Sequence, residues 1–227
     1  FDIGTRKNPA ILVLLKPTVD ANGTITPNTN IWVAQGSTTN FLVTAADYYH
    51  VAGVETDGVA VVDTFGGSSY NFIYSNIMVV GTGTIHGLIA PTLTTNPAAP
   101  NVPHFWLAGH KLTNDTTDFE QAAAADQDDD EMSTADEYVA GTDPTNRFSS
   151  FRIIFRGRLH GSNVVRWIGG TSDGNMTNPY QVLVRTNLKS GVWDATGFID
   201  RVNGTNTWMY VAPTNSKVFF YRIKATD

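Results

Sequence analysis

The residues best suited to chemistry lie in one acidic run, residues 126–137, which reads Asp-Gln-Asp-Asp-Asp-Glu-Met-Ser-Thr-Ala-Asp-Glu. Positions 1, 3, 5 and 12 of the run are carboxylates, namely Asp126, Asp128, Asp130 and Glu137. In twelve-residue loops this spacing wraps oxygen ligands around Ca²⁺, with a bidentate Glu at position 12 and a backbone carbonyl from position 7, here Met132. The run therefore predicts a Ca²⁺ site.

The charge of the chain is concentrated around this run. Residues 112–146 hold 11 of the 21 Asp and Glu residues and no Lys or Arg. The rest of the chain carries 10 acidic and 15 basic residues, so the net charge of −6 divides into −11 for this segment and +5 elsewhere. A bound hard cation is the simplest explanation for such a local excess of negative charge.

The composition favours β-structure and gives little sign of other function classes. A chain of 227 residues with 41% apolar and 16% charged residues, rich in Gly, Thr and Asn, suits turn-rich strands in one large or two small domains. There is no cysteine, so stability must come from packed cores, with or without the help of a metal. No apolar run reaches the roughly 18 residues that span a membrane, and no Arg cluster indicates nucleic acid.

The first part of the chain reads as short strands. Runs rich in Val, Ile, Thr and aromatic residues lie between Gly, Asn and Asp residues, at 31–34, 39–44, 51–56, 59–62, 70–74 and 84–89. Regular short strands of this kind indicate a β-sandwich or barrel. Asp57-Gly58 between two apolar runs predicts a tight hairpin, because Gly accepts the positive φ that such a turn needs.

Residues 19–90 also resemble a known module. The segments Gly23-Thr24-Ile25-Thr26-Pro27, Gln35-Gly36-Ser37 and Val54-Glu55-Thr56-Asp57-Gly58 are similar to the small Ig-like repeats of large secreted bacterial surface proteins, loosely related to the B-repeats of internalin-type adhesins. The family's closing motif is altered here to Thr84-Ile85-His86-Gly87-Leu88-Ile89-Ala90. The resemblance implies an Ig-like sandwich as the first domain, over residues 1–95.

A linker domain is expected over residues 96–147. Pro91, Pro97, Pro100 and Pro103 stiffen the connection without building a core. Residues 114–118 form a cap-rich start for a short helix over 119–125, and Ser133 with Asp136 can cap a second helix that Gly141 and Pro144 end. The linker is thus a helix, an acidic loop and a helix.

The last part, residues 148–227, returns to alternating strands. Residues 151–156, 180–185 and 219–224 largely alternate apolar and polar residues, as half-buried antiparallel strands do. We expect a second sandwich of about seven to eight strands. The fold class is therefore all-β, with two antiparallel β-sandwich domains joined by the helix–acidic loop–helix linker.

Residues 126–146 resemble the thrombospondin type 3-like and dockerin-like calcium repeats that join β-domains in secreted proteins of environmental bacteria. The match runs from the acidic run through Glu137-Tyr138-Val139-Ala140-Gly141-Thr142-Asp143-Pro144-Thr145-Asn146. In such proteins a sandwich often follows, with elements similar here to Tyr180, Val182, Leu188, Gly191-Val192-Trp193 and Phe220-Tyr221-Arg222-Ile223. Asp143 is a candidate supplementary ligand; it equally suits a cap ahead of Pro144.

The loop departs from the family at two positions. The family places Gly at positions 4 and 6, where this chain has Asp129 and Glu131. Position 6 normally has a positive φ, which costs a non-Gly residue about 1 kcal/mol or more. The neighbouring carboxylates also repel one another unless a cation is present. Two interpretations follow: Ca²⁺ in a distorted loop, or a solvated acidic linker without metal.

Other residues suggest no active site. His50, His86, His104, His110 and His160 lack the spacing of a zinc site, and no nucleophile elbow, P-loop or dinucleotide motif occurs. Five tryptophans allow a sugar-binding interpretation. Trp167 and Trp193 lie in strand patterns and should be core, whereas Trp32 and Trp208, among Asn and Thr, are the candidates for exposure.

The first 15 residues allow two interpretations. A nearly continuous apolar run at 8–15 follows a polar leader. It is either the first strand of its own domain, or a strand donated to the sheet edge of a neighbouring subunit, which would give a head-to-tail polymer.

Taken together, the sequence predicts a non-enzymatic, secreted or cell-surface bacterial protein with a structural or adhesive role. It would act as a spacer, matrix component or filament subunit whose linker is made rigid by Ca²⁺. The expected partners are other copies of the chain through residues 1–15, or a glycan, without nucleic acid or membrane insertion. The alternative is a carbohydrate-binding accessory region of a secreted polysaccharide-degrading enzyme.

Overall fold

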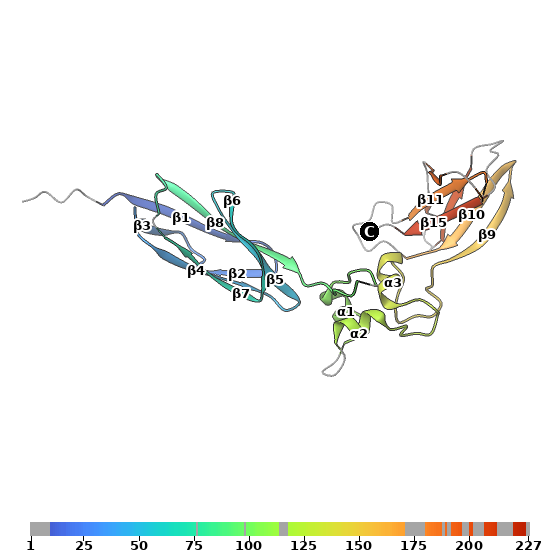
Figure 1. Cartoon of the computed structure of the whole chain (residues 1–227), viewed down its shortest axis with the longest axis horizontal. Helices are drawn as coiled ribbons and strands as arrows, with labels where there is room; N and C mark the ends of the chain where they lie inside the picture. Colours follow the sequence, from blue (N-terminus) through green and yellow to red (C-terminus); the bar gives the residue numbers. More distant parts are fainter. Residues whose placement is uncertain are drawn as a thin grey trace, which may run out of the picture. The chain divides into compact units, whose positions relative to one another are not determined.

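The computed structural model describes residues 10–75, 77–97, 99–113, 118–170, 180–187, 189, 192–196, 200–201, 207–212 and 220–225. This part is predominantly β, with several sheets and three helices, in agreement with the predicted all-β class (Figure 1). The chain divides into two compact units. Unit 1 comprises Phe1–Leu93 and Pro103–Phe105, and unit 2 comprises Thr94–Val102 and Trp106–Asp227.

Unit 1 contains eight described strands in two sheets. They are β1 (Leu12–Val19), β2 (Gly23–Thr26), β3 (Ile31–Ala34), β4 (Thr39–Ala45), β5 (Tyr49–Thr56), β6 (Val59–Gly67), β7 (Ser69–Tyr74) and β8 (Thr82–Pro91). One sheet has the order β3-β1-β8-β5-β6 and the other β2-β4-β7. Buried side chains of both sheets, including Leu15, Phe41, Val43, Val51 and Ile85, form one core. All six strands predicted between residues 31 and 89 are confirmed.

The predicted hairpin at Asp57-Gly58 is confirmed. β5 and β6 pair antiparallel with Thr56 opposite Val59, and the two turn residues have φ of 51° and 75°. A two-residue turn of this type needs positive φ at both central positions. The Asp57 carboxylate also accepts a hydrogen bond of 2.7 Å from the backbone N–H of Thr84, which ties the turn to β8.

The first described strand, β1, is bonded on both edges within its own chain. It pairs antiparallel with β3 and parallel with β8, and it buries Val13 and Leu15. It begins later than the predicted apolar run and continues to Val19. Residues 1–9 lie outside the described residues, so strand donation through residues 1–15 stays a prediction.

The helical part of unit 2 packs around a small core of its own. Both expected helices are present, as α2 (Phe119–Ala124) and α3 (Thr134–Ala140), and a further helix, α1 (His104–Gly109), belongs to unit 2 from Trp106 onward. The Asp118 carboxylate caps α2 by accepting from the N–H of Gln121 at 2.6 Å. α3 begins at the Ser133 cap and ends at Gly141, which is left-handed with φ of 64°. The buried side chains between the helices are Val102, Leu107, Ala122, Ala123 and Ala135.

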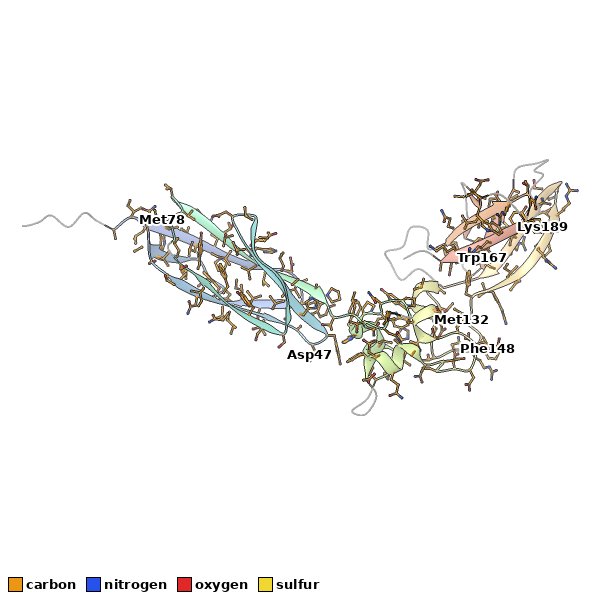
Figure 2. The ribbon with its side chains drawn as sticks, in the orientation of Figure 1. Asp47, Met78, Met132, Phe148, Trp167 and Lys189 are labelled. Atoms are coloured by element: carbon orange, nitrogen blue, oxygen red, sulfur yellow. The ribbon has the colours of Figure 1, made fainter. Side chains whose placement is uncertain are left out.

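The C-terminal part of unit 2 contains two more sheets. Its described strands are β9 (Arg152–Leu159), β10 (Ser162–Ile168), β11 (Tyr180–Arg185), β12 (Asp194–Ala195), β13 (Asp200–Arg201), β14 (Thr207–Val211) and β15 (Phe220–Ala225). The sheet orders are β13-β14-β10-β9 and β12-β11-β15. The three strands predicted here match β9, β11 and β15. Side chains of both sheets share a core that includes Trp167, which Figure 2 labels, together with Tyr180, Val182, Trp208 and Tyr210.

The tryptophan predictions are partly correct. Trp167 is fully buried and Trp32 is 64% exposed, as expected. The prediction that Trp208 is exposed is wrong: it is 5% exposed, because β14 places it opposite Trp167 and its indole N–H donates to the carbonyl of Gly170 at 3.2 Å. Trp193 is half-buried, with the Arg185 guanidinium 5.6 Å from its ring centre.

Candidate metal centre

Three aspartates of the acidic loop between α2 and α3 come together. Asp126, Asp128 and Asp130 each offer an oxygen that lies within 4.8 Å of the oxygens of the other two. Asp126 is exposed, while Asp128 and Asp130 are half-buried. Three carboxylates gathered this closely could hold a metal ion.

Hydrogen bonds from the loop backbone hold these carboxylates in place. The two oxygens of Asp126 accept from the N–H groups of Asp130 at 3.2 Å and Glu131 at 2.9 Å. Asp130 Oδ1 accepts from the N–H of Met132 at 2.9 Å. The loop backbone therefore curls around the carboxylate of Asp126, which is position 1 of the loop.

The two ends of the loop are joined at the start of α3. The N–H and the hydroxyl of Thr134 both donate to the carbonyl of Ala125, at 2.8 and 3.0 Å. Ser133 Oγ accepts from the N–H of Asp136 at 3.1 Å and donates to its carboxylate at 2.7 Å. This capping arrangement fixes the first turn of α3, from which Glu137 projects.

Glu137 is the most unusual of the predicted ligands, because it is fully buried. Its Oε1 accepts from the hydroxyl of Thr142 at 3.1 Å, whereas Oε2 has no hydrogen-bond partner among the described residues. Burial raises the pKa of Glu137 to about 8; the Thr142 bond opposes this rise, and the charges of Asp128, Asp130 and Asp126 add to it. A buried carboxylate beside other carboxylates is costly unless something compensates its charge.

Two of the three grouped aspartates also have carboxylate oxygens without a hydrogen-bond partner among the described residues. Both carboxylate oxygens of Asp128 and Oδ2 of Asp130 are buried and lack a hydrogen-bond partner in the described part of the chain. Burial, followed by the charges of Asp130 and Asp126, raises the pKa of Asp128. These donors are all oxygens, which hard cations such as Ca²⁺ and Mg²⁺ prefer. The residues present therefore fit a hard metal ion.

Two non-glycine residues of the loop have left-handed backbone conformations, at the positions where glycine is expected from the sequence. Asp129 has φ of 60° and Glu131 has φ of 76°, both in the left-handed region. These are loop positions 4 and 6. Only Gly, and to a lesser degree Asn or Asp, adopts this region readily, so Glu131 is the more strained of the two.

The remaining predicted ligands have other contacts. Met132, labelled in Figure 2, accepts a hydrogen bond at its Sδ; the donor is the N–H of Phe151, at 3.3 Å. Asp143 Oδ1 accepts from the N–H and hydroxyl of Thr145 at 3.0 and 2.7 Å, the cap-like contact that was one of its two predicted roles. Its charge also contributes to the raised pKa of Asp128. Among the described residues, Glu137 and Asp143 are not in the group of three whose oxygens lie within 4.8 Å of one another.

A buried polar contact joins α3 to the C-terminal strands, and sequence reasoning missed it. The carbonyl of Ala140 accepts from the Tyr180 hydroxyl at 2.5 Å and from the Gly170 N–H at 3.2 Å, and Gly170 also donates to the Tyr180 oxygen at 2.8 Å. Burial raises the pKa of Tyr180 to about 12, so the hydroxyl keeps its proton. A Cβ on Gly170 would lie 1.2 Å from the carbonyl oxygen of Gly141, which explains a glycine there. The Gly169-Gly170 pair was the available signal.

No protein-family model matches this chain, and no curated protein or solved structure does either. The described helices include none long and apolar enough to cross a membrane. The function is therefore inferred from the geometry of the acidic loop.

Proposed function

We propose that this chain is a non-enzymatic extracellular structural or adhesive protein in which Ca²⁺, bound by the acidic loop, makes unit 2 rigid. The observation that carries the proposal is Glu137, fully buried with an unpartnered Oε2 in the electrostatic range of three grouped aspartates. A cation supplies the missing charge and the missing ligand at once. A solvated acidic linker would have no reason to bury this side chain.

Ca²⁺ suits the donors better than Mg²⁺. Ca²⁺ accepts six to eight oxygens in flexible geometry and takes bidentate carboxylates, whereas Mg²⁺ demands a near-ideal octahedron and retains water. The loop offers Asp126, Asp128, Asp130 and Glu137, and we propose the Met132 carbonyl as a fifth ligand. Asp143 completes the set only if it gives up part of its contact with Thr145.

The ion would act mechanically within unit 2. It would tie the loop to the first turn of α3 through Glu137, while the other end of α3 is held to the C-terminal strands through Ala140, Tyr180 and Gly170. Helix α3 is only seven residues long, so it has little stability without such contacts. Metal binding is thereby coupled to the order of the whole unit.

The wider proposal concerns fold type and location. The two sheets and shared core of each unit support β-sandwiches, and we propose the Ig-like type for unit 1. A loop with two non-Gly residues at positive φ is expected to bind Ca²⁺ weakly, and a weak site is filled where calcium is plentiful, as it is for extracellular modules. This supports a secreted or cell-surface bacterial protein of the modular type.

The test compares two variants with the same change of charge. Glu137→Gln removes the buried ligand, whereas Glu131→Gln removes an exposed carboxylate outside the proposed ligand set. We expect Glu137→Gln to weaken Ca²⁺ binding at least about tenfold, and Glu131→Gln to change it little, as measured by isothermal titration calorimetry on metal-free protein. Equal effects of the two substitutions would contradict a specific site and indicate that Ca²⁺ responds only to the overall negative charge of the loop.

The carbohydrate-binding alternative now depends on one side chain. With Trp208 buried, Trp32 on the edge strand β3 is the one predicted sugar platform that is exposed in the described structure. Quenching of Trp fluorescence by polysaccharides that disappears in Trp32→Ala would favour this alternative.

A further inference from the structure

Two of the sheet edges in the described structure are long, and their sequences carry opposite charges. The described sheets have eight edges, which are formed by β2, β3, β6, β7, β9, β12, β13 and β15. Only β6, with nine residues, and β9, with eight, are longer than six residues. An exposed, long, apolar edge strand presents unpaired N–H and C=O groups and is a template for pairing with another chain.

β9 is exposed on both of its faces. Seven of its eight residues are exposed and the eighth, Gly157, is half-buried. The exposed side chains include Ile153 at 53%, Phe155 at 42% and Leu159 at 44%. On the sheet, β9 is paired to β10 and to no second described strand. Exposed apolar side chains grouped along one edge strand mark a candidate surface for interaction with another chain.

β6, in unit 1, is also a long edge strand with exposed apolar side chains at its start. It pairs only with β5 among the described strands, and Val59 and Val61 are 66% and 46% exposed. The pairing of β6 with β5 has two irregular steps, at Val51/Gly53 and Val54/Glu55, and the pairing of β9 with β10 has one, at Arg166/Trp167. The regular pairing outside these steps includes Val59 in β6 and Leu159 in β9.

The charges of the two strands are opposite. β9 contains Arg152, Arg156 and Arg158 and no acidic residue, whereas β6 and its turn contain Asp57 and Asp63 and no basic residue. Residues 147–227 as a whole carry 11 basic and 4 acidic residues, whereas residues 1–93, which include β6, carry 3 basic and 6 acidic residues. Opposite charges across a strand pair stabilise it and like charges destabilise it. Pairing of β9 with β9, or with the basic edge β15, is therefore disfavoured.

We propose that β9 of one copy of this chain pairs antiparallel with β6 of a second copy. Antiparallel pairing is the commoner and slightly stronger arrangement. Because the two surfaces differ, each copy keeps one unused edge after pairing, so the contact adds copies in a head-to-tail series. This interface uses neither residues 1–15 nor the metal centre, and it goes beyond the proposed calcium-dependent rigidity.

Disulfide trapping between full-length chains tests the pairing, since the sequence has no cysteine of its own. One preparation carries Val59→Cys, activated as a mixed disulfide, and the other carries Leu159→Cys, so only unlike copies become joined. Val80→Cys replaces Val59→Cys as the control, because Val80 is 84% exposed and lies outside the strands of unit 1. We expect the V59C–L159C pair to react about tenfold faster than the V80C–L159C pair.

Two further measurements test the role of charge and the direction of the pairing. Arg156→Glu with Arg158→Glu in the L159C chain should remove most of the rate advantage while leaving the circular dichroism spectrum unchanged, and added salt should also reduce it. Faster reaction of V59C with I153C than with L159C would overturn the antiparallel register. Equal rates for V59C and V80C would overturn pairing of β9 with β6 altogether.

Discussion

At the scale of single residues, Glu137 links the chemistry of the loop to the stability of the protein. Its pKa is raised from 4.5 to about 8. Between these two pH values the folded, metal-free protein therefore holds a proton that the unfolded chain has released. Stability falls with pH wherever the folded state binds more protons. The contribution is therefore fully present below pH 4.5 and is lost as the pH rises through about 8.

This pH dependence can be measured directly. Urea unfolding of metal-free protein between pH 5 and pH 8.5 should show a free energy of unfolding that decreases as the pH rises across the window set by Glu137. Saturating Ca²⁺ should remove or reverse the trend, because the ion binds the deprotonated carboxylate. The variant Glu137→Gln, which cannot ionise, serves as control. A slope that persists unchanged in this variant would assign the effect to other groups.

A second residue-scale prediction concerns the left-handed residue Glu131. At φ of 76°, glycine avoids the steric cost that any Cβ meets, so Glu131→Gly should be more stable than Glu131→Ala by about 1 kcal/mol. Both substitutions remove the same charge, which isolates the backbone effect. Chemical denaturation of the two variants in parallel measures the difference. Equal stabilities would mean that the loop relaxes away from the left-handed conformation.

At the scale of elements, the Tyr180 hydroxyl is the contact that binds α3 to the C-terminal strands. Tyr180→Phe leaves the carbonyl of Ala140 and the N–H of Gly170 with fewer partners in a buried place, and we expect a loss of about 1–3 kcal/mol. Tyr221→Phe is the matched control, because its buried hydroxyl has no hydrogen-bond partner among the described residues. The two variants should separate clearly in thermal or urea unfolding. Equal losses would show that the Tyr180 bridge adds no stability of its own.

The elements themselves were largely predictable, because their signals are local. Alternation located the strands around Phe41 and Val182, Ser133 and Gly141 marked the ends of α3, and Asp57-Gly58 marked the hairpin. The spacing of the acidic run likewise located the three aspartates that come together.

What could not be predicted depends on contacts between distant segments. Trp208 looked exposed because its neighbours in sequence are polar, yet strand pairing sets it against Trp167. The bond between Tyr180 and Ala140 spans 40 residues, and no periodicity carries that information. The burial of Glu137 is of the same kind, since position 12 of a calcium-type loop is set by spacing but its environment is set by packing.

At the scale of the whole molecule, the candidate metal centre and the contacts that hold α3 belong to unit 2 alone. The acidic loop, α3, Gly170 and Tyr180 all lie in Thr94–Val102 and Trp106–Asp227, while unit 1 has a separate core. A ligand that binds only the folded form stabilises it by about 2.7 kcal/mol at a hundredfold excess over Kd. The stabilisation by Ca²⁺ should therefore appear in one unit and not in the other.

Differential scanning calorimetry of the full chain, with Ca²⁺ and after its removal, tests this claim most directly. We predict two transitions, of which one moves to higher temperature with Ca²⁺ and the other, from unit 1, stays in place. In Glu137→Gln the moving transition should lose its response to Ca²⁺. If neither transition responds to Ca²⁺, or if both shift by the same amount in wild type and Glu137→Gln alike, the proposed calcium centre is contradicted.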